Sequence, residues 1–589
     1  MKFQQRSCVV AALVFILVVT SSVNLWLVAH DDRPPWWDYA YYLSSSLNIY
    51  NAIGRGSFSQ LFAAISDPYR PPLVPLAALP FYAAFGTGYR SAMLVTVLFL
   101  AILTVSTYKL GKIIHSCGLG LVAAGVVSTL PGVMTYTRVF NIDFPTMALV
   151  PAGMYFAVAS EGFRKRGMSL ALGAVIGLGL LTKWSYIVFL APMIIAESIH
   201  HRRNLGSANM ILSGLVAAAT ASAWYVNALR HGLIQSLIHY AYGAAAKPYV
   251  QGLGSMFDLS TLLFYPFALY ERLMGPFYFV TLFSAVILAS IVGAVFLRGW
   301  LKSLVSSRLT RSLAFSFLAP LMIFTFLELK SVRYFLPALP SLVILLLAIV
   351  WNTHARLGPL LLVGILVGGS LVSVVGALEP TIGARWGIYD SWTIYDTIPH
   401  YYSEYQPPKS DDWKLEQMIQ LVARLNPQAN IGTLADHWVF NQDTLTYYAV
   451  RLGFDTLRFR DFRDSQIYPP YDDLNYYDFI LLKTGIIGFD WDTQTVRGIL
   501  QRLNSSDDAF YVDHNMVGSF SLPDDSQLFV FMKIVSSSVA QAPQHSPLSF
   551  CVPTCLEISC MTGFEPQRYA SLARLRAAKE APRAEKCLQ

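Results

Sequence analysis

Long apolar runs alternate with short polar stretches over the first two thirds of the chain. From Val9 to about Leu378, runs of membrane-spanning length are separated by small basic clusters. A helix needs about 20 apolar residues to cross the hydrocarbon core, because lipid offers the backbone no hydrogen-bond partners. After Glu379 the charged and polar residues reach the density of an ordinary soluble protein. The pattern therefore predicts a membrane domain, residues 1–379, and a water-soluble domain, residues 380–535.

The basic clusters predict how the apolar runs are threaded. The first run follows Lys2 and Arg6 and is too long for the apolar part of a cleaved signal peptide, so we expect a retained first helix that starts in the cytoplasm. Further basic clusters occur at residues 109–112, 164–166, 202–203, 298–311 and 354–356. Basic residues gather in cytoplasmic loops, so each stretch between two clusters crosses an even number of times, which gives about eleven crossings.

This parity predicts where individual stretches turn. Residues 168–199 turn near Lys183, residues 312–351 turn at 328–333, residues 117–160 turn at 136–143, and residues 207–297 turn through a loop around His239. An odd number of crossings places the soluble domain outside the cytoplasm. We expect a multi-pass protein of the bacterial inner membrane, mostly α, with an extracytoplasmic α/β domain.

The soluble domain mixes helical and strand patterns. Apolar residues have helical spacing in DDWKLEQMIQLVARLN and TQTVRGILQRLN, whereas ANIGTLA and YDFILLKTG have the pattern of buried strands. SFSLPDDSQLFVFMKIV has the pattern of a hairpin that turns at Pro-Asp-Asp. A predicted strand is followed by Asp436, His437 and Trp438, a position where ligand-binding residues often lie. Both a structural role and a role in acceptor binding are compatible with this position. Residues 536–589 are rich in Ser, Pro and Ala and then basic, and we expect them to be largely disordered.

Composition narrows the function classes. The chain is 54% hydrophobic and 13% charged, with a formal net charge of +7. Membrane orientation explains the basic loops, so no nucleic-acid partner is indicated. The sequence contains no GxGxxG, GxxxxGK[ST] or HExxH string. Four of the six cysteines crowd the last 40 residues, at spacings that are not those of a zinc site, which leaves tail disulfides or an inert tail.

Six charged residues beside apolar segments fall on the outer face by the parity argument. They are Asp38, Arg70, Asp143, Lys183, Lys330 and Arg333. A charge near the centre of a membrane helix costs roughly 2.5–3.5 kcal/mol unless it pairs or reaches water. Taken alone, each of these residues can also be interpreted as a snorkelling anchor or as one half of a structural ion pair. Together, two carboxylates and four cations on one face suit a site for the anionic headgroup of a lipid.

The first outer loop carries the most specific pattern. Its aromatic residues are Trp36, Trp37, Tyr39, Tyr41 and Tyr42, which taken alone form an interfacial belt. Asp38 lies inside this belt, where a carboxylate contributes nothing to anchoring. The Pro pair after Arg70 begins an apolar helix that is too short to span, so we expect it to lie in the plane of the interface.

Five motifs in order over residues 31–350 resemble the C-type glycosyltransferases that use polyprenyl-phosphate sugars. WDYAYYL is similar to the motif after their first helix, and YRPPLVPLAALPFYAAFG to their KPPLYY element. TRVFNIDFPTMAL, GLGLLTKWSYIVFLAP and LKSVRYFLPALPSLVILLLA follow at the family's spacing. The nearest branches are the protein O-mannosyltransferases and the lipid A transferases for aminoarabinose and galacturonic acid.

The resemblance implies inverting transfer of a sugar from a polyprenyl monophosphate carrier to a lipid, glycan or protein acceptor. Asp38 matches the aspartate that acts as base on the acceptor, and Asp143 matches the second acid. The matches to the donor phosphate are Arg70, Lys183 and Arg333, with Lys330 beside them. Tyr39 and Tyr69 stand where some branches carry acids, so no metal site or other cofactor is indicated, although a divalent metal stays open.

Two other classes fit parts of the pattern. A transporter or flippase for a lipid-linked or anionic substrate is the alternative to an enzyme, and a scaffold for envelope assembly is a third class. A transporter favours paired half-repeats and charges near the middle of the bilayer. We find no internal repeat, and the charged residues gather at one edge of the apolar segments. An enzyme therefore accounts best for the sequence.

Overall fold

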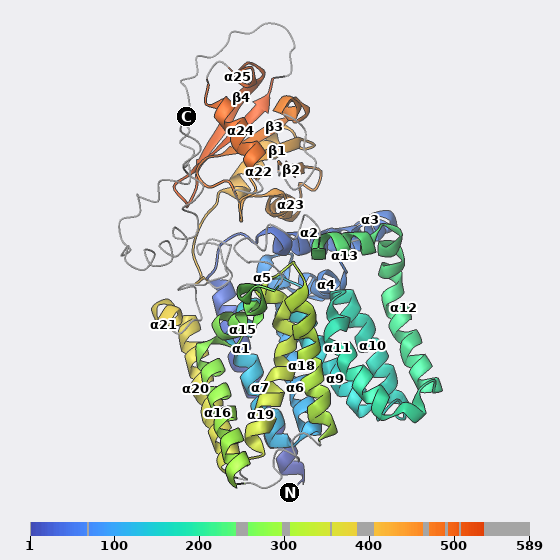
Figure 1. The fold of residues 1–589 in the computed structure, drawn as a ribbon. Coiled ribbons are helices and arrows are strands. Elements are labelled where there is room, and N and C mark those ends of the chain that lie inside the picture. Colours follow the sequence, from blue (N-terminus) through green and yellow to red (C-terminus); the bar gives the residue numbers. More distant parts are fainter. Residues whose placement is uncertain are drawn as a thin grey trace, which may run out of the picture.

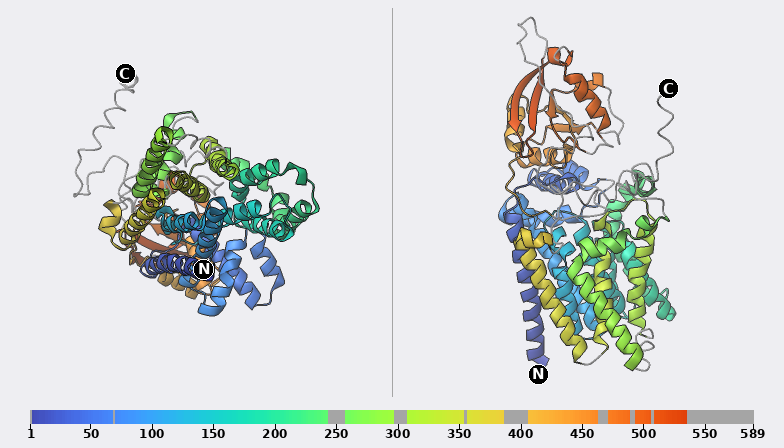
Figure 2. Two further views of the ribbon diagram at one scale, coloured as in Figure 1. Left: turned by 90° about the horizontal axis from the view of Figure 1, so that it is seen from below. Right: turned by 60° about the vertical axis from the view of Figure 1, so that its left-hand side comes forward.

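The computed structural model describes a helical bundle with a sheet domain at one end (Figure 1). It covers residues 2–67, 70–242, 257–296, 307–353, 356–385, 406–462, 471–488, 493–505 and 508–534. The N-terminus lies at the end of the bundle opposite the sheet domain (Figure 2). The predicted disorder of residues 536–589 falls outside the described residues.

In the part of the chain that the structure describes, seven helical segments are long and apolar enough to cross a membrane. They are α1 (Lys2–Ala29), α5 with α6 (Tyr89–Ala92 and Leu94–Ile114), α12 (Ala208–Arg230), α16 (Gly275–Phe296), α18 (Arg308–Phe326), η4 with α19 (Val332–Ala338 and Leu339–Trp351) and α20 (Leu357–Leu378). Shorter helices pack beside them: α7 (Cys117–Thr129), α9 (Asp143–Ala159), α10 (Arg166–Thr182) and α11 (Tyr186–His200). The chain is a multi-pass integral membrane protein, and the number of about eleven crossings stays a prediction.

Three turns predicted by charge parity are confirmed. α10 ends at Thr182 and α11 begins at Tyr186, so residues 168–199 form two short helices that turn at Lys183. α18 ends at Phe326 and η4 begins at Val332. In the third stretch, α8 (Pro131–Tyr136) is followed by α9 at Asp143. Each turn falls where charged or polar residues interrupt an apolar run, because such residues are costly inside the hydrocarbon core.

Short helices cover the end of the bundle that faces the sheet domain. α2 (Trp37–Gly54), α3 (Phe58–Ile65) and α13 (Leu233–Tyr242) lie across this end (Figure 1). α4 (Leu73–Phe85) begins after the Pro pair, as predicted, and packs against α2. The remaining short elements are η1 (Arg202–Asn204), α14 (Leu259–Leu262), α15 (Phe264–Ala268), η3 (Leu269–Leu273), α21 (Pro380–Arg385) and η6 (Tyr471–Tyr476).

The C-terminal region is a mixed five-stranded sheet with helices, as its pattern predicts. Its strands are β1 (Asn430–Leu434), β2 (Arg458–Asp461), β3 (Phe479–Lys483), β4 (His514–Ser521) and β5 (Gln527–Lys533), in the order β2-β1-β3-β5-β4. β1 pairs in parallel with β2 and β3, and the predicted hairpin β4–β5 is antiparallel to β3. Its helices are α22 (Leu415–Leu425), α23 (Gln442–Arg451), α24 (Gln494–Leu503) and α25 (Phe510–Asp513).

The hydrophobic cores of the two regions interlock. Trp36 and Trp37 from the first loop pack against the core of the sheet domain. In return, Tyr447 and Val450 of α23 belong to the core of the membrane region. α23 lies on α2 (Figure 1), and Asp455 just beyond it forms an ion pair with the Arg55 guanidinium at the end of α2. The sheet domain is therefore packed against the helix whose first turn carries the predicted catalytic aspartate.

Candidate active site

The six predicted site residues come from five places in the chain, all at the end of the bundle that faces the sheet domain. Asp38 and Asp143 lie in the first turns of α2 and α9. Arg70 precedes α4, and Lys183 lies between α10 and α11. Lys330 and Arg333 come from the segment between α18 and α19. The helix dipole favours a carboxylate in the first turn of a helix, which suits both aspartates.

Local packing fixes the positions of Asp143 and Lys183. The Asn141 side-chain oxygen accepts a 2.9 Å hydrogen bond from the Phe144 backbone N–H, which defines the start of α9 and so the place of Asp143. At the turn that carries Lys183, a Cβ on Gly179 would lie 2.2 Å from the ring of Tyr186. Only glycine therefore permits α10 and α11 to close this tightly.

Five of the six residues form one continuous chain of ion pairs. Arg70 Nη2 lies 3.0 Å from Asp38 Oδ1, and Arg333 Nη2 lies 2.8 Å from Asp38 Oδ2. The same Arg333 side chain extends to the second carboxylate, with Nε 3.8 Å from Asp143 Oδ2. Lys183 Nζ lies 2.5 Å from Asp143 Oδ1. Arg333 thus bridges two aspartates that are far apart in the sequence.

The chain of ion pairs has a buried end and an open end. The Asp143 and Lys183 side chains are only 4% and 12% exposed. The Asp38, Arg70 and Arg333 side chains are 33%, 31% and 23% exposed. A ligand can therefore contact the open end, whereas the buried pair holds the geometry from below.

The two arginines control the charge of Asp38. Burial by itself would raise the pKa of Asp38, but the Arg333 and Arg70 guanidiniums outweigh burial and lower that pKa to about 2. An opposite charge at contact distance favours the ionised carboxylate. Asp38 is therefore a carboxylate over the whole physiological pH range, and it becomes a stronger base only when the arginines are drawn toward another anion.

Aromatic rings support the cations of the site, a role that the sequence pattern of an interfacial belt does not indicate. The Arg70 guanidinium carbon lies 3.7 Å from the centre of the Tyr41 ring. The Tyr334 ring lies 4.2 Å from Lys183 Nζ and 5.5 Å from the guanidinium carbon of Arg333. The face of an aromatic ring attracts a cation, which compensates part of the desolvation of these side chains. In the sequence, the only indication of this contact is that Tyr334 directly follows Arg333.

Lys330 makes different contacts from the other five residues. Its Nζ donates to the backbone carbonyls of Phe324, Thr325 and Leu327, at 3.3, 2.7 and 2.8 Å. These carbonyls end α18, where backbone oxygens lack helical partners. Burial lowers the pKa of Lys330 to about 8. These three contacts are those of a helix cap, and contact with a donor phosphate stays a proposal.

A Lys330→Met variant separates these two roles. The substitution keeps the apolar stem and removes three hydrogen bonds, and a buried group left unsatisfied costs about 1–3 kcal/mol. We expect a lower thermal midpoint of the purified protein and a donor affinity within about twofold of wild type, a range below the effect of one charged hydrogen bond. Lys183→Met is the comparison, because Lys183 belongs to the ion-pair chain. A large loss of donor affinity in Lys330→Met would assign Lys330 to the phosphate instead.

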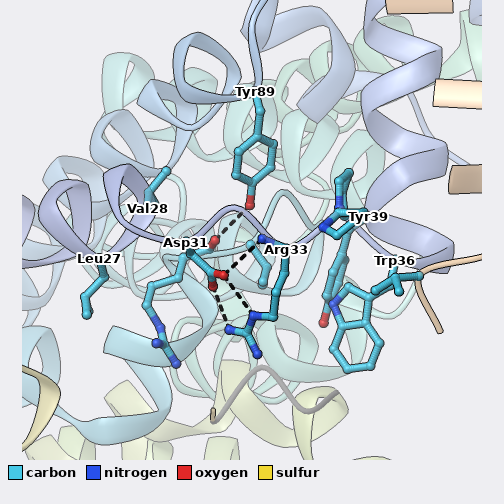
Figure 3. A pocket seen from close by; sticks show the side chains of 12 residues that line it. Leu27, Val28, Asp31, Arg33, Trp36, Tyr39 and Tyr89 are labelled. Carbon is cyan, nitrogen blue, oxygen red and sulfur yellow. Dashed lines mark hydrogen bonds and ion pairs between the residues drawn. The ribbon is translucent and has the colours of Figure 1, made fainter. Parts of the chain in front are cut away.

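A pocket lies next to the N-terminus of α2 (Figure 3). Its lining includes Trp36, the residue before α2, and Tyr39 of α2. Val439 lines it from the sheet domain. Within it, Arg33 forms a two-point contact with Asp31, at 2.8 and 2.6 Å. Trp36 and Tyr39 are close to Asp38 in the sequence, so the same short segment contributes to the pocket and to the ion-pair chain.

The residues after β1 are buried rather than presented to solvent. Asp436, His437 and Trp438 are 3%, 0% and 1% exposed. Burial, together with the Lys483 ammonium, holds the pKa of His437 well below its usual range, so the ring is neutral. This burial favours the structural role over acceptor binding. Among the described residues, no three His, Cys, Asp or Glu side chains group as a metal site would need.

A helical membrane bundle that gathers acids and cations beneath a sheet domain agrees with what the sequence resemblance to the C-type glycosyltransferases implies. Residues 69–226 match the model of the dolichyl-phosphate-mannose-protein mannosyltransferase family. The match covers less than half of the chain, and it indicates a glycosyltransferase and so favours the enzyme over the transporter. The matched segment contains Arg70, Asp143 and Lys183, whereas Asp38 and Arg333 lie outside it.

Solved structures show low-level likeness over most of the chain. ArnT from Cupriavidus metallidurans bound to undecaprenyl phosphate is 16% identical, with a TM-score of 0.44 over 75% of this chain and 76% of that one. The Archaeoglobus fulgidus oligosaccharyltransferase in complex with Zn and sulfate is 11% identical, with a TM-score of 0.46 over 80% and 67%. No curated protein matches the sequence significantly.

Proposed function

We propose that the enzyme transfers a sugar from a polyprenyl monophosphate carrier to a hydroxyl group of a lipid, glycan or protein, with inversion at the anomeric carbon. The observation that carries this proposal is the bridge from Asp38 through Arg333 to Asp143, flanked by Arg70 and Lys183. It joins two carboxylates to three cations at the edge of a membrane bundle. The matched family, named for a dolichyl-phosphate-linked mannose, supports a donor of this class.

The cations fit the charge that develops on the donor. A sugar joined to a polyprenyl phosphate is a phosphodiester with one negative charge, and the departing polyprenyl phosphate gains a second. Preorganised cations aimed at this growing charge lower the barrier. A guanidinium carries five N–H donors in a planar fork, so Arg70 and Arg333 can contact phosphate oxygens while they also contact Asp38.

Asp38 is the proposed general base. The acceptor hydroxyl gives its proton to the Asp38 carboxylate as its oxygen attacks the anomeric carbon, and the bond between that carbon and the phosphate oxygen breaks. The polyprenyl phosphate leaves with the electron pair, and Asp38 later releases the proton to water. A donor phosphate beside Arg70 and Arg333 competes for their charge, which raises the proton affinity of Asp38 when the donor is bound.

Asp143 is the proposed positioning acid. It is nearly buried, and it contacts both Arg333 and Lys183. A buried carboxylate between two cations fixes both side chains in one geometry, which spares their reorganisation when the donor binds. Asp143 therefore acts on the donor phosphate through its partners and not as a base.

A mass-spectrometric comparison tests the proposed function and identifies the acceptor. Envelope glycolipids and glycoproteins are compared between cells with the protein, cells without it, and cells that carry Asp38→Asn. We expect one glycan-bearing species to be lost both without the protein and in the variant, and to return with the wild-type chain. Identical profiles in all three cells, at verified expression, contradict transfer to an envelope acceptor.

The sidedness of the proposed site has its own test. A variant with all six native cysteines replaced by serine receives a single cysteine, either at Asp412 in the sheet domain or at Arg203 in the basic turn. The Asp412 side chain is 62% exposed, and Arg203 is also exposed. Because basic loops face the cytoplasm, we expect a membrane-impermeant maleimide to label Asp412→Cys in intact cells and Arg203→Cys only after permeabilisation. The opposite result would reverse the orientation.

A further inference from the structure

We propose that the sheet domain is part of the catalytic centre, because a hydrogen bond from Trp37 to Asp436 sets the position of Asp38. Trp37 and Asp436 are then positioning residues that act on the reaction through their neighbour. This inference rests on the proposed function, in which Asp38 is the base. It gives the sheet domain a direct role in turnover rather than only in acceptor binding.

The backbone at Trp37 needs external support. Trp37 is the first residue of α2 and has a φ of +34°, in the left-handed region that bulky side chains rarely adopt. Such conformations persist where the surrounding structure holds them, and they cluster at functional sites. The next residue is Asp38, so the torsion angles at Trp37 decide where the Asp38 carboxylate points.

The sheet domain supplies that support through the Trp37 indole. Trp37 Nε1 donates a 3.1 Å hydrogen bond to Asp436 Oδ1. The centre of the Trp37 ring lies 6.3 Å from that of the Trp438 ring. The Trp36 ring stacks on the Trp37 ring, with 6.1 Å between their centres. Asp436 is 3% exposed, so the hydrogen bond is shielded from water. A hydrogen bond that is shielded from water is stronger than the same bond exposed to solvent.

The acceptor of this hydrogen bond is itself held firmly. Asp436 follows β1, the strand between β2 and β3, and its backbone N–H donates to the Ile487 carbonyl at 2.7 Å. Nearby, Thr444 Oγ1 donates to the Pro35 carbonyl at 3.0 Å, which ties the loop just before Trp36 to α23. Open α/β sheets commonly bind ligands at the carboxyl ends of their parallel strands. Here that edge contacts the protein's own first loop.

A second contact between the same two elements provides a matched control. Asp455 forms an ion pair with Arg55, which ends α2. With 18 residues, α2 is about 27 Å long, so this contact lies far from Asp38. Both contacts dock the sheet domain on α2, and only the Trp37 contact adjoins the reacting carboxylate.

The test measures sugar transfer and stability in purified full-length variants. The probe is a short-chain polyprenyl phosphate that carries radiolabelled mannose, with membranes from cells lacking the protein as the acceptor. We expect Trp37→Phe, which keeps an aromatic ring and removes the N–H donor, to lower kcat about ten- to a hundredfold, in line with the cost of a small misplacement. We expect the KM for the donor and the thermal midpoint to stay close to wild type.

Further variants keep the inference open to contradiction if Trp37→Phe folds poorly. Asp436→Ala should reproduce the loss of kcat, Asp436→Asn should retain most activity because its amide oxygen still accepts the hydrogen bond, and Trp37→Phe with Asp436→Ala should lose no more than either alone. Asp455→Ala should leave kcat unchanged. Equal losses of kcat in Asp455→Ala and Trp37→Phe would overturn the inference, because docking alone would then explain both.

The same experiment separates failure of this inference from failure of the proposed function. An active wild-type enzyme whose kcat is unaffected by Trp37→Phe and Asp436→Ala overturns the positioning role and leaves the proposed function intact. A wild-type enzyme that transfers no sugar from the probe to any acceptor in the membranes, while it binds the unglycosylated polyprenyl phosphate, overturns the proposed function and with it the inference.

Discussion

Asp38→Asn is expected to abolish sugar transfer while the protein folds and binds its donor. The substitution preserves size and one hydrogen-bond acceptor, but it removes the negative charge that takes the proton. A general base contributes roughly 10²–10⁴-fold to the rate, or about 3–5 kcal/mol of barrier. Arg70 and Arg333 lose their anionic partner, so donor affinity is expected to stay the same or to increase. The measurement is kcat for transfer, with polyprenyl phosphate binding measured separately.

Asp32→Asn is the matched control for this variant. Asp32 lies in the loop that leads to α2, its side chain is 59% exposed, and its partner Arg90 lies 3.8 Å away, outside the ion-pair chain. Its transfer rate should equal that of wild type. If Asp38→Asn retained more than about a tenth of wild-type transfer, the base assignment would be contradicted. The loss of rate would then be smaller than the roughly hundredfold minimum expected for removal of a general base. Asp143 would then be the next candidate for the base.

The second large effect is expected at Arg333. Arg333→Ala removes the side chain that joins Asp38 to Asp143 and, in the proposed mechanism, contacts the donor phosphate. A hydrogen bond to a charged group contributes about 1.5–3 kcal/mol, which is roughly ten- to a hundredfold in affinity or rate. Since phosphate charge is present in the ground state and grows in the transition state, both donor affinity and kcat should fall.

Arg333→Lys and Arg90→Ala define what Arg333 contributes. Lysine keeps the charge and loses the planar fork, so it should recover part of the donor affinity and little of kcat. Arg90 is 67% exposed and pairs with Asp32, so Arg90→Ala should change neither value. Full activity in Arg333→Lys would show that a point charge suffices and that the two-carboxylate bridge has no part in turnover.

The membrane region could be predicted closely because lipid imposes a simple rule on the sequence. Charged residues are costly in the hydrocarbon core, so Lys183 and the 328–333 stretch had to mark turns, and the structure places turns there. The strands and helices of the sheet domain also followed from their apolar periodicity, including the hairpin β4–β5.

The site could be predicted in its members but not in its contacts. The order of the motifs predicts that Asp38 and Arg333 belong to the same site. Spacing along the chain cannot show that Arg333 bridges two carboxylates. Lys330 lies three residues before Arg333, yet its ammonium is directed to the backbone carbonyls at the end of α18. Which way a side chain points depends on the turn that carries it, and this turn is irregular.

Contacts between the two domains could not be predicted from the sequence for a related reason. Trp37 fits an interfacial aromatic belt, and only the packed structure shows its indole hydrogen-bonded to Asp436, 399 positions away. No local pattern encodes a pairing over that separation. The same holds for Thr444 and the Pro35 carbonyl, 409 positions apart.

One measurement tests the central claim, chemical transfer from a polyprenyl-phosphate sugar, most directly. Purified wild-type protein and Asp38→Asn are placed in sealed vesicles with a polyprenyl phosphate carrying radiolabelled mannose, together with acceptor membranes extracted from cells that lack the protein. Wild type should convert the donor to free polyprenyl phosphate and to glycosylated acceptor in equal amounts, and Asp38→Asn should convert neither. Movement of intact donor across the vesicle membrane by both proteins, without any loss of sugar from the carrier, would contradict the account.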